Sequence, residues 1–378
     1  MPRRGPPSPF ERVIPGHPRG MVPENAQPQA IEPSDQPPAG DAKGRKRPVV
    51  VITGATAGVG RATARAFARQ GADIGLIARD TDGLESAAAE AALSGVDVVV
   101  APADVASDAE VEEAASTIEQ QLGPIDVWVN NAMTAVFAPF LEVTAEEYER
   151  VTRVTYLGAV NGTRAALSRM VPRNKGRVVQ VGSALAFHGI PLQSAYCGAK
   201  HAIKGFTDSV RAELLHDGSA VTVGMVQLPA MNTPQFRIVR SRMPRKPMPV
   251  PPIYAPEIAA RAIVWMAGHP RRRELWVGGI TTAAILAGRV APGLMDHYLA
   301  KTAVDSQLTD EPADRGTRDN LYEPVQEDEG AHGDFDQMEH EHSPLTSLAM
   351  HRGATAAAAA AGVAAGAGAV AYGIARRR

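Results

Sequence analysis

Short apolar runs alternate with longer amphipathic segments between residues 48 and 280. The runs are continuous rather than alternating, which is typical of parallel strands that are buried on both faces. Most runs are followed by a segment with helical periodicity, so the pattern predicts repeated β-α units. We therefore predict a single α/β domain, built as a doubly wound sheet of seven parallel strands with helices on both faces.

The predicted elements can be placed directly on the sequence. The strands are PVVVITGA (48–55), ADIGLIA (72–78), VDVVVAPAD (96–104), PIDVWVNNA (124–132), GRVVQVGS (176–183), AVTVGMVQL (220–228) and ELWVGG (274–279). The helices are expected over residues 60–71, 83–93, 107–122, 144–171, 194–216 and 256–268.

Four further segments lie outside the predicted domain of residues 48–280. Residues 1–47 contain eleven prolines and no periodicity, which predicts a disordered extension. Residues 281–300 are apolar and predict a helical extension. Residues 301–353 predict a solvated acidic linker, because residues 301–350 carry thirteen acids against three basic residues. Residues 354–378 form an Ala-rich tail that ends in an arginine cluster.

The tail raises the question of membrane association. Ala354–Ala375 is uncharged and, as a helix, has roughly the length that crosses the ~30 Å hydrocarbon core. Alanine and glycine are only weakly lipophilic, however. A positive-inside end at residues 376–378 would also leave the main domain outside the cell. A spanning helix, an interfacial segment, a tail packed on a partner and a disordered tail stay open as alternatives.

Charge and cysteine content narrow the classes of function. The 378-residue chain has a net charge of −2, which argues against general electrostatic binding to nucleic acid. A single cysteine, Cys197, excludes an internal disulfide framework and fits a reducing compartment. The N-terminus shows no apolar core of a secretory signal, so we expect a cytoplasmic protein. We assign no metal site.

A glycine-rich turn, TGATAGVG, joins the first predicted strand to the first predicted helix. Its glycines, Gly54, Gly58 and Gly60, allow a tight turn and the close approach of a ligand to the backbone. The first amides of the helix, that of Val59 among them, would face the negative charge of a pyrophosphate. Together with Thr53 at the strand end, the turn predicts a dinucleotide site.

The end of the second strand distinguishes between two dinucleotides. An acid there would bond the ribose 2′-hydroxyl of NAD, whereas a cation favours the 2′-phosphate of NADP. Arg79 stands at this position. A guanidinium binds phosphate through two parallel hydrogen bonds, so Arg79 favours NADP over NAD. The alternative is a surface arginine paired with Asp80 or Asp82.

Ser183, Tyr196 and Lys200 have the spacing of an acid–base site. Tyr196 and Lys200 lie four residues apart on one predicted helix, so they share a face. The ammonium of Lys200 is expected to lower the pKa of the Tyr196 phenol from about 10. A phenol tuned in this way passes a proton to or from a carbinol oxygen near neutral pH. Ser183, at the end of the fifth strand, is placed to hydrogen-bond the same oxygen.

The TGxxxGxG turn, Ser183 and the YxxxK motif together resemble the short-chain dehydrogenase/reductase family. The resemblance implies a Rossmann fold and an oxidoreductase that interconverts a small-molecule secondary alcohol and a carbonyl. It implies that Ser183 polarises the substrate oxygen, that Tyr196 is the general acid/base, and that Lys200 holds the nicotinamide ribose. It also implies a homo-oligomer, either a dimer or a tetramer.

The same resemblance assigns further residues to the cofactor. Asp104 and Val105 resemble the pair that holds the adenine. Asn130 and Ala132 belong to the sequence NNA, which is similar to a family motif that borders the adenosine ribose. Thr233 is expected to bond the nicotinamide carboxamide.

Four positions depart from the family pattern. Met133 replaces a glycine after NNA. Thr155 stands where many relatives have an asparagine that joins the lysine to solvent through a water, and a hydroxyl lacks the donor–acceptor pair of an amide. Leu228 and Pro229 replace a Pro-Gly pair before Thr233. These departures keep a second class of function open, a cofactor-binding sensor or scaffold with little turnover.

Residues 234–255 correspond to the family's substrate lid. Their apolar members, joined by Leu185 and Met231 in the predicted substrate site, indicate a lipophilic substrate. The lid also carries five basic residues, for which an anionic substrate, a membrane surface and a solvated loop are alternatives: Arg237, Arg240, Arg242, Arg245 and Lys246. A membrane-tethered enzyme acting on lipids therefore stays open as a variant of the oxidoreductase.

Overall fold

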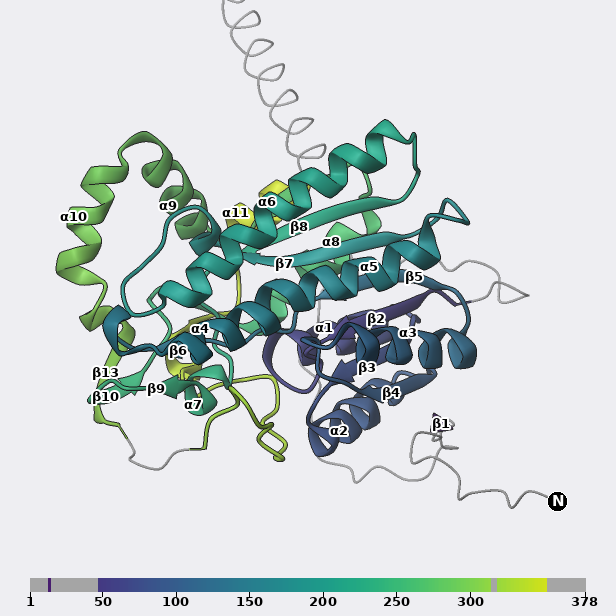
Figure 1. Ribbon diagram of the computed structural model, residues 1–378, viewed down its shortest axis with the longest axis horizontal. Helices are drawn as coiled ribbons and strands as arrows, with labels where there is room; N and C mark the ends of the chain where they lie inside the picture. The colour runs from purple at the N-terminus through teal and green to yellow at the C-terminus, as the bar shows by residue number, and fades with distance from the viewer. Residues whose placement is uncertain (1–12, 15–46, 314–317, 352–378) are drawn as a thin grey trace, which may run out of the picture.

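A sheet of seven parallel strands runs through the centre of the protein (Figure 1). The computed structural model describes residues 13–14, 47–313 and 318–351. In spatial order the strands are β4 (Val98–Pro102), β3 (Asp73–Ala78), β2 (Val49–Thr53), β5 (Ile125–Asn130), β7 (Arg177–Ser183), β8 (Thr222–Leu228) and β12 (Glu274–Trp276). The predicted doubly wound fold is confirmed.

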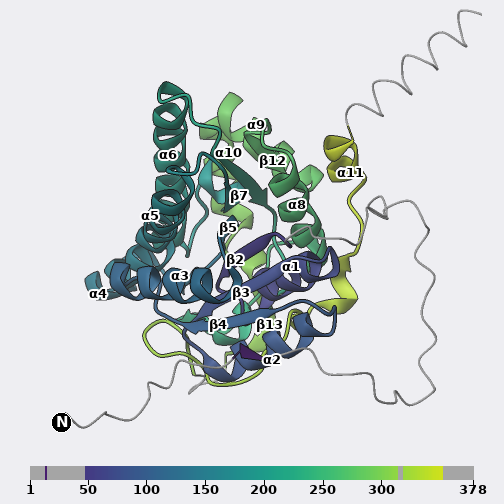
Figure 2. The same cartoon turned by 90° about the vertical axis from the view of Figure 1, so that its right-hand side faces the viewer.

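Two layers of helices cover the sheet (Figure 2). One face is covered by α1 (Gly58–Arg69), α2 (Thr81–Ala92) and α8 (Pro256–Gly268). The other is covered by α3 (Asp108–Leu122), α5 (Gly158–Met170) and α6 (Ser194–His216). The strand order reverses between β2 and β5, and in such sheets ligands bind beyond the carboxyl ends of the strands at this point.

The composition of the strands explains the two layers. Every residue of β2, with the sequence VVVIT, is buried. Val50 and Ile52 pack into the apolar cluster beneath α1 and α8, whereas Val49 and Val51 pack into the cluster beneath α3 and α5. Because successive side chains of a strand point to opposite faces, a continuous apolar run supplies both cores at once.

The long helix predicted over residues 144–171 is interrupted. It consists of α4 (Ala145–Val151), a π-helical turn (Thr152–Leu157) and α5. A single π-turn inside an α-helix is frequently found at a functional site. Here the turn contains Thr155, whose contacts are described below.

The extension of residues 281–300 is a pair of helices, as predicted, although the first begins two residues earlier. These are α9 (Gly279–Val290) and α10 (Pro292–Thr302). Both lie beyond the end of β12, on the left of Figure 1. The exposed apolar residues of the pair include Val290 and Leu294.

The acidic segment packs on the domain, which differs from the solvated linker that its charge predicts. Two short strands of this segment pair with the lid: β13 (Leu308–Pro312) with β10 (Arg245–Pro247), and β14 (Glu339–His340) with β11 (Ile253–Tyr254). Between them Leu321 is fully buried. The segment closes with α11 (Pro344–Met350), whose Leu345 lies against Gly279.

The remaining elements are short. They are β6 (Val136–Phe137), which pairs with β9 (Arg240–Ser241), the one-turn helix α7 (Gln235–Ile238), and β1 (Val13–Ile14), which pairs antiparallel with β4. Apart from β1, the predicted disordered extension of residues 1–47 lies almost wholly outside the described residues, and so does the tail of residues 354–378. Within the described ranges no helix combines the length and the apolar character needed to cross a membrane.

Candidate active site

The glycine-rich turn brings the end of β2 close to the start of α1. Gly54 has a φ of +65°, and a Cβ there would lie 2.7 Å from the Cα of Ala132. A Cβ on Gly60 would lie 2.0 Å from the carbonyl oxygen of Gly54. Only glycine fits at either position, because one needs left-handed backbone and the other has no room for a side chain. No side chain caps α1, so its first amides are available to an acceptor from outside the helix.

Ser183, Tyr196 and Lys200 line one cavity of about 900 Å³, as the sequence predicts. Ser183 ends β7, whereas Tyr196 and Lys200 lie in the first two turns of α6. The Lys200 ammonium donates to the carbonyl of Val181 at 2.8 Å and lies 5.5 Å from the centre of the Tyr196 ring. The edge of the sheet and the helix therefore direct the three side chains into the same space.

Burial shifts the pKa values of two of these three side chains, Tyr196 and Lys200. It raises the pKa of the Tyr196 phenol above its usual value, and a hydrogen bond with Ser183 offsets only part of the rise. It also lowers the pKa of Lys200 to about 8. The direction for Tyr196 is opposite to the one expected from the sequence, because burial disfavours the charged phenolate. At neutral pH the geometry therefore holds a protonated phenol beside an ammonium that loses its proton readily.

The wall of the cavity around this trio is largely apolar. Leu185 and Met231 belong to it, as predicted. One side is formed by α9 and α10, through Ile280, Leu294 and other apolar residues. The cavity volume lies in the range of sites that hold small molecules.

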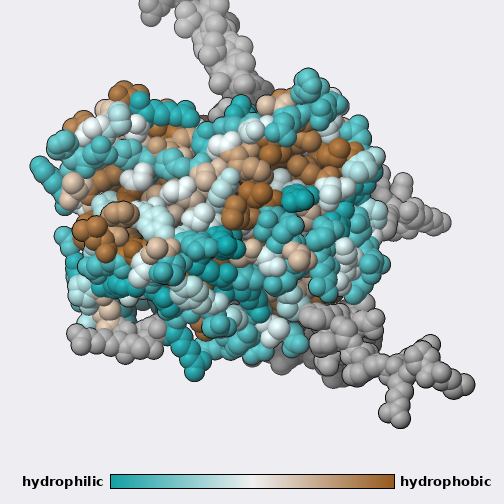
Figure 3. Space-filling model, viewed as in Figure 1, coloured by the Kyte–Doolittle hydropathy of each residue, from teal (hydrophilic) through white to brown (hydrophobic). Residues whose placement is uncertain are grey.

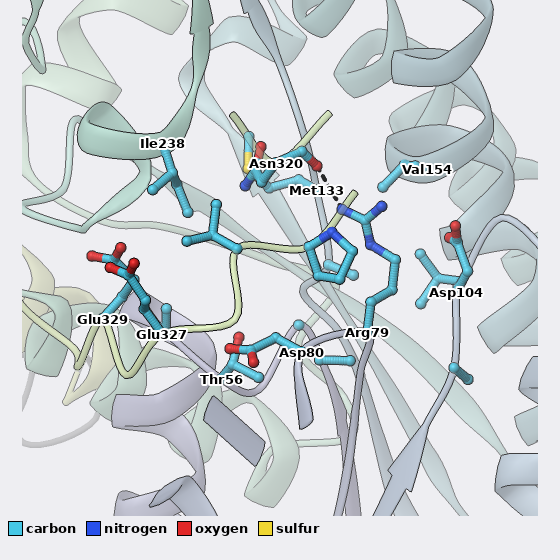
Figure 4. Close-up of a pocket in the computed structure, with 18 residues that line it drawn as sticks. Thr56, Arg79, Asp80, Asp104, Met133, Val154, Ile238, Asn320, Glu327 and Glu329 are labelled. Atoms are coloured by element: carbon cyan, nitrogen blue, oxygen red, sulfur yellow. Dashed lines mark hydrogen bonds between the residues drawn. The ribbon is translucent and has the colours of Figure 1, made fainter. Parts of the chain in front are cut away.

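A second cavity, of about 120 Å³, adjoins the first at the carboxyl ends of β3 and β4 (Figure 4). Arg79, Asp104 and Val105 line it, as expected for the adenosine end of a dinucleotide site. Asp104 is fixed by Arg150, which donates to its carboxylate at 2.6 Å. Gly54 and Ala132 line both cavities, so the two lie next to each other at the glycine-rich turn.

The predicted site residues thus divide into three groups. The larger cavity is lined by Gly54, Gly58, Val59, Ala132, Ser183, Leu185, Tyr196, Lys200, Met231 and Thr233. The smaller cavity contains Arg79, Asp104 and Val105. Four predicted residues line neither cavity, namely Thr53, Gly60, Asn130 and Thr155.

Three of these four brace the turns around the site. The Thr53 hydroxyl accepts hydrogen bonds from the amides of Asn131 and Ala132, at 3.0 and 3.1 Å. Asn130 joins β5 to α5 by donating to Thr163 at 3.0 Å. Thr155 accepts from the amide of Thr134 at 3.0 Å and donates to its carbonyl at 2.9 Å. These residues fix neighbouring backbone by hydrogen bonds, and their own side chains do not line either cavity.

Thr155 should therefore matter more for stability than for proton transfer. Thr155→Val removes both bonds to buried backbone groups, and we expect it to lower the free energy of unfolding by about 1–3 kcal/mol. Chemical denaturation measures this loss. The matched control is Thr207→Val, because the Thr207 hydroxyl is buried without a hydrogen-bond partner. Equal stability of the two variants would contradict the bracing role.

The five basic residues of the lid face acids of the same chain. Ion pairs join Arg237 to Glu329, Arg240 to Asp319, Arg242 to Glu147, Arg245 to Asp305 and Lys246 to Glu311. Arg242 and Arg240 also hold the pKa of the Glu147 carboxyl below its usual value, against the effect of burial. Neither a free solvated loop nor a cationic surface describes the lid in this arrangement. Figure 3 shows a largely hydrophilic surface in the lower part of the same view.

Sequence reasoning missed several residues that line the cavities. Asn131 lines the larger one and donates to the carbonyls of Thr53 and Gly54, at 3.1 and 3.0 Å. Asn131 stands inside the NNA sequence, from which only Asn130 and Ala132 were assigned to the cofactor. Asn320 lines both cavities, and no local pattern could indicate this. It lies about 240 residues after Arg79, in the segment that its charge predicts to be solvated.

The fold and the site define a dinucleotide-binding oxidoreductase of the Rossmann class. A family profile described as short chain dehydrogenase matches residues 48–243, so the chain belongs to the short-chain dehydrogenase family. It is similar to the uncharacterized oxidoreductase YxnA of Bacillus subtilis, with 32% identity over 280 residues that cover 74% of this chain and 78% of that protein. It is also similar to 2-(S)-hydroxypropyl-CoM dehydrogenase 3 of Xanthobacter autotrophicus, with 36% identity over 48% of this chain and 70% of that one.

Solved structures agree with this family. An alcohol dehydrogenase from the archaeon Thermococcus sibiricus, complexed with 5-hydroxy-NADP, superposes with a TM-score of 0.54 at 28% identity. The match covers 61% of this chain and 96% of that structure. The actinorhodin polyketide ketoreductase with NADPH gives a TM-score of 0.55 at 24% identity, which supports the fold alone.

Proposed function

We propose that the protein is an NADP(H)-dependent oxidoreductase that interconverts a secondary alcohol and a carbonyl on a lipophilic small molecule. The observation that carries the proposal is the convergence of Ser183, Tyr196 and Lys200 on one apolar cavity that continues over the glycine-rich turn. Neither an apolar cavity nor the acid–base trio alone would indicate this chemistry.

The residues present fit a dinucleotide. The uncapped start of α1 offers backbone amides, and the narrow space at Gly54 and Gly60 leaves the backbone open to close approach. Thr233 lies beside Gly58 at the entrance to the larger cavity, where it would bond the carboxamide. When bound, the cofactor would supply or accept the hydride.

The chain's own residues would manage the proton and the substrate oxygen. Tyr196, kept protonated by burial, would donate its proton to the oxygen of a carbonyl as the carbon is reduced. Ser183 would hydrogen-bond the same oxygen, and Lys200 would contribute positive charge next to the phenol. The apolar wall would exclude water and select a lipophilic substrate.

A screen of carbonyl compounds with NADPH tests this proposal. Oxidation of NADPH that depends on a carbonyl substrate is the expected result. The second candidate is a cofactor-binding sensor with little turnover. It is favoured by the contacts of Thr155, which occupy the hydroxyl with backbone groups. Cofactor binding without turnover across a broad panel would support that candidate instead.

Arg79 should set the choice of cofactor. Its guanidinium lines the adenosine end of the path, where a 2′-phosphate would lie. We expect Arg79→Asp to raise KM for NADPH and to improve the use of NADH, as initial rates with both cofactors would measure. Arg153→Asp, at an exposed position paired with Glu149, is the control. An unchanged ratio of NADPH to NADH efficiency would remove Arg79 from the cofactor site.

A homo-oligomer and a cytoplasmic location, with membrane association through the tail, remain part of the proposal. The location rests on composition and the oligomer on family resemblance.

A further inference from the structure

Residues 318–330, here called the strap, cross the adenosine end of the cofactor path. Asn320, Pro324, Val325, Glu327 and Glu329 of the strap line the smaller cavity (Figure 4). The strap belongs to the acidic segment and lies over the carboxyl ends of β3 and β4, although it follows these strands by more than 200 residues in the sequence. The domain and the strap together therefore enclose the space in which the adenosine would lie.

Carbonyl groups of the strap accept hydrogen bonds from the donors that we assign to the cofactor. Both terminal nitrogens of Arg79 donate to strap carbonyls, those of Tyr322 and Asn320, each at 2.5 Å. The amide of Gly58, at the start of α1, donates to the carbonyl of Gly330 at 3.0 Å. Three donors that would serve the phosphates are thus satisfied by backbone oxygens of the chain itself.

The space left beneath the strap is small and lined by acids. Its volume of about 120 Å³ is well below the ~300 Å³ at which pockets for small molecules begin. Glu327 and Glu329 line it, and the strap carries five acids and one arginine in thirteen residues. Both acids are ion-paired, Glu329 with Arg237 and Glu327 with Arg318, so they take up space at the adenosine end rather than add unpaired charge to it.

Side chains at several points hold the strap in this position. Leu321 is fully buried, and its carbonyl accepts from Arg150 at 2.9 Å. Asp328 pairs with the buried Arg61 and accepts from Ser86 at 2.6 Å. These contacts lie outside the cofactor path, so they fix the strap without serving a ligand.

We propose that the strap is an autoinhibitory element, which takes the place of the adenosine half of NADP(H) and must leave before the cofactor binds. The proposal rests on the proposed function for the identity of the ligand. Cofactor and strap then compete for Arg79 and for the start of α1. The measured Kd for the cofactor then equals the Kd of the open form divided by the fraction of molecules in which the strap is open.

Direct binding of NADPH, measured by calorimetry without substrate, tests the competition. Replacing residues 318–330 by a Gly/Ser chain of equal length should lower Kd about tenfold if the strap is closed nine-tenths of the time. Asp328→Asn, which weakens one anchor and keeps the rest, should lower Kd by a smaller factor. Glu311→Gln is the control, since it removes an acid that pairs with Lys246 outside the strap. Unchanged or weaker binding in the folded replacement and in Asp328→Asn would overturn the proposal.

Hydrogen exchange in the unmodified protein provides a second, independent measurement. We expect the amides of residues 318–330 to exchange faster when NADPH is added, because the cofactor displaces the strap. Slower exchange would show that the strap closes over the cofactor, and this would overturn autoinhibition. If neither the unmodified protein nor the strap replacement binds NADPH or NADH, the proposed function fails. If both bind NADPH equally, only the strap proposal fails.

Discussion

Tyr196→Phe should reduce turnover by about 10²–10⁴-fold, the range typical of a positioned acid–base group. The raised pKa keeps the Tyr196 phenol protonated at neutral pH, and the phenol shares a hydrogen bond with Ser183. Phenylalanine keeps the ring and its packing and removes only the proton donor. Affinity for NADPH should therefore be retained.

Steady-state rates with the best carbonyl substrate, together with NADPH binding, measure this outcome. Tyr156→Phe is a suitable control, because that ring packs on Phe206 and lines neither cavity. Turnover above about a tenth of the original in Tyr196→Phe would remove the tyrosine from its role. A loss of NADPH binding in the same variant would assign Tyr196 to the cofactor instead.

Lys200→Met should abolish most of the turnover and at the same time stabilise the protein. Burial lowers the pKa of Lys200 from 10.5 to about 8, so holding the ammonium inside costs free energy at neutral pH. A shift of this size corresponds to up to about 3 kcal/mol. Methionine fills a similar volume without charge, although it loses the hydrogen bond to Val181.

The pH dependence follows from the sign of this shift. Below about pH 8 the folded protein carries the ammonium and the full cost is present. Between pH 8 and 10.5 the folded state loses the proton before the unfolded state does, and the cost declines to zero. Denaturation curves should therefore show the largest gain of Lys200→Met below pH 8 and none above pH 10.5. Lys204→Met, which removes a half-buried pair with Asp208 on the same helix, is the matched control.

The sequence predicted the sheet, and it predicted that Ser183, Tyr196 and Lys200 lie together, because both depend on local patterns. Continuous apolar runs such as VVVI can be buried only in a covered parallel sheet, and spacing within one helix decides which face Tyr196 and Lys200 share. The fate of the charged segments could not be predicted in this way. Arg240 and Asp319 are 79 residues apart, and nothing local to either indicates the other. From composition alone, the basic lid and the acidic segment are therefore each predicted to face solvent, whereas in the structure they pack against each other.

The burial of the Tyr196 phenol could not be predicted for a similar reason. A neighbouring ammonium lowers the pKa of a phenol, whereas burial of the phenol raises it. The YxxxK motif indicates only the first of these two effects. Burial depends on what else covers the site, and here α9 and α10 close one side of the cavity. The departure at Thr155 was recognised, but its partner Thr134 was not, because a hydrogen bond across 21 residues leaves no mark in a periodic pattern.

The pairing of the lid with residues 305–339 also has a consequence for how the chain is made. Synthesis proceeds from the N-terminus, and domains usually begin to fold before the chain is complete. The sheet and its trio can form from residues 48–280, while the acids that pair with Arg237, Arg240 and Arg245 are still to come. The lid therefore acquires several of its acidic partners only as this later segment leaves the ribosome, whereas Arg240 and Arg242 can pair with Glu147 before that. Until then, a nascent chain would carry a folded sheet beneath a lid whose basic residues are only partly paired.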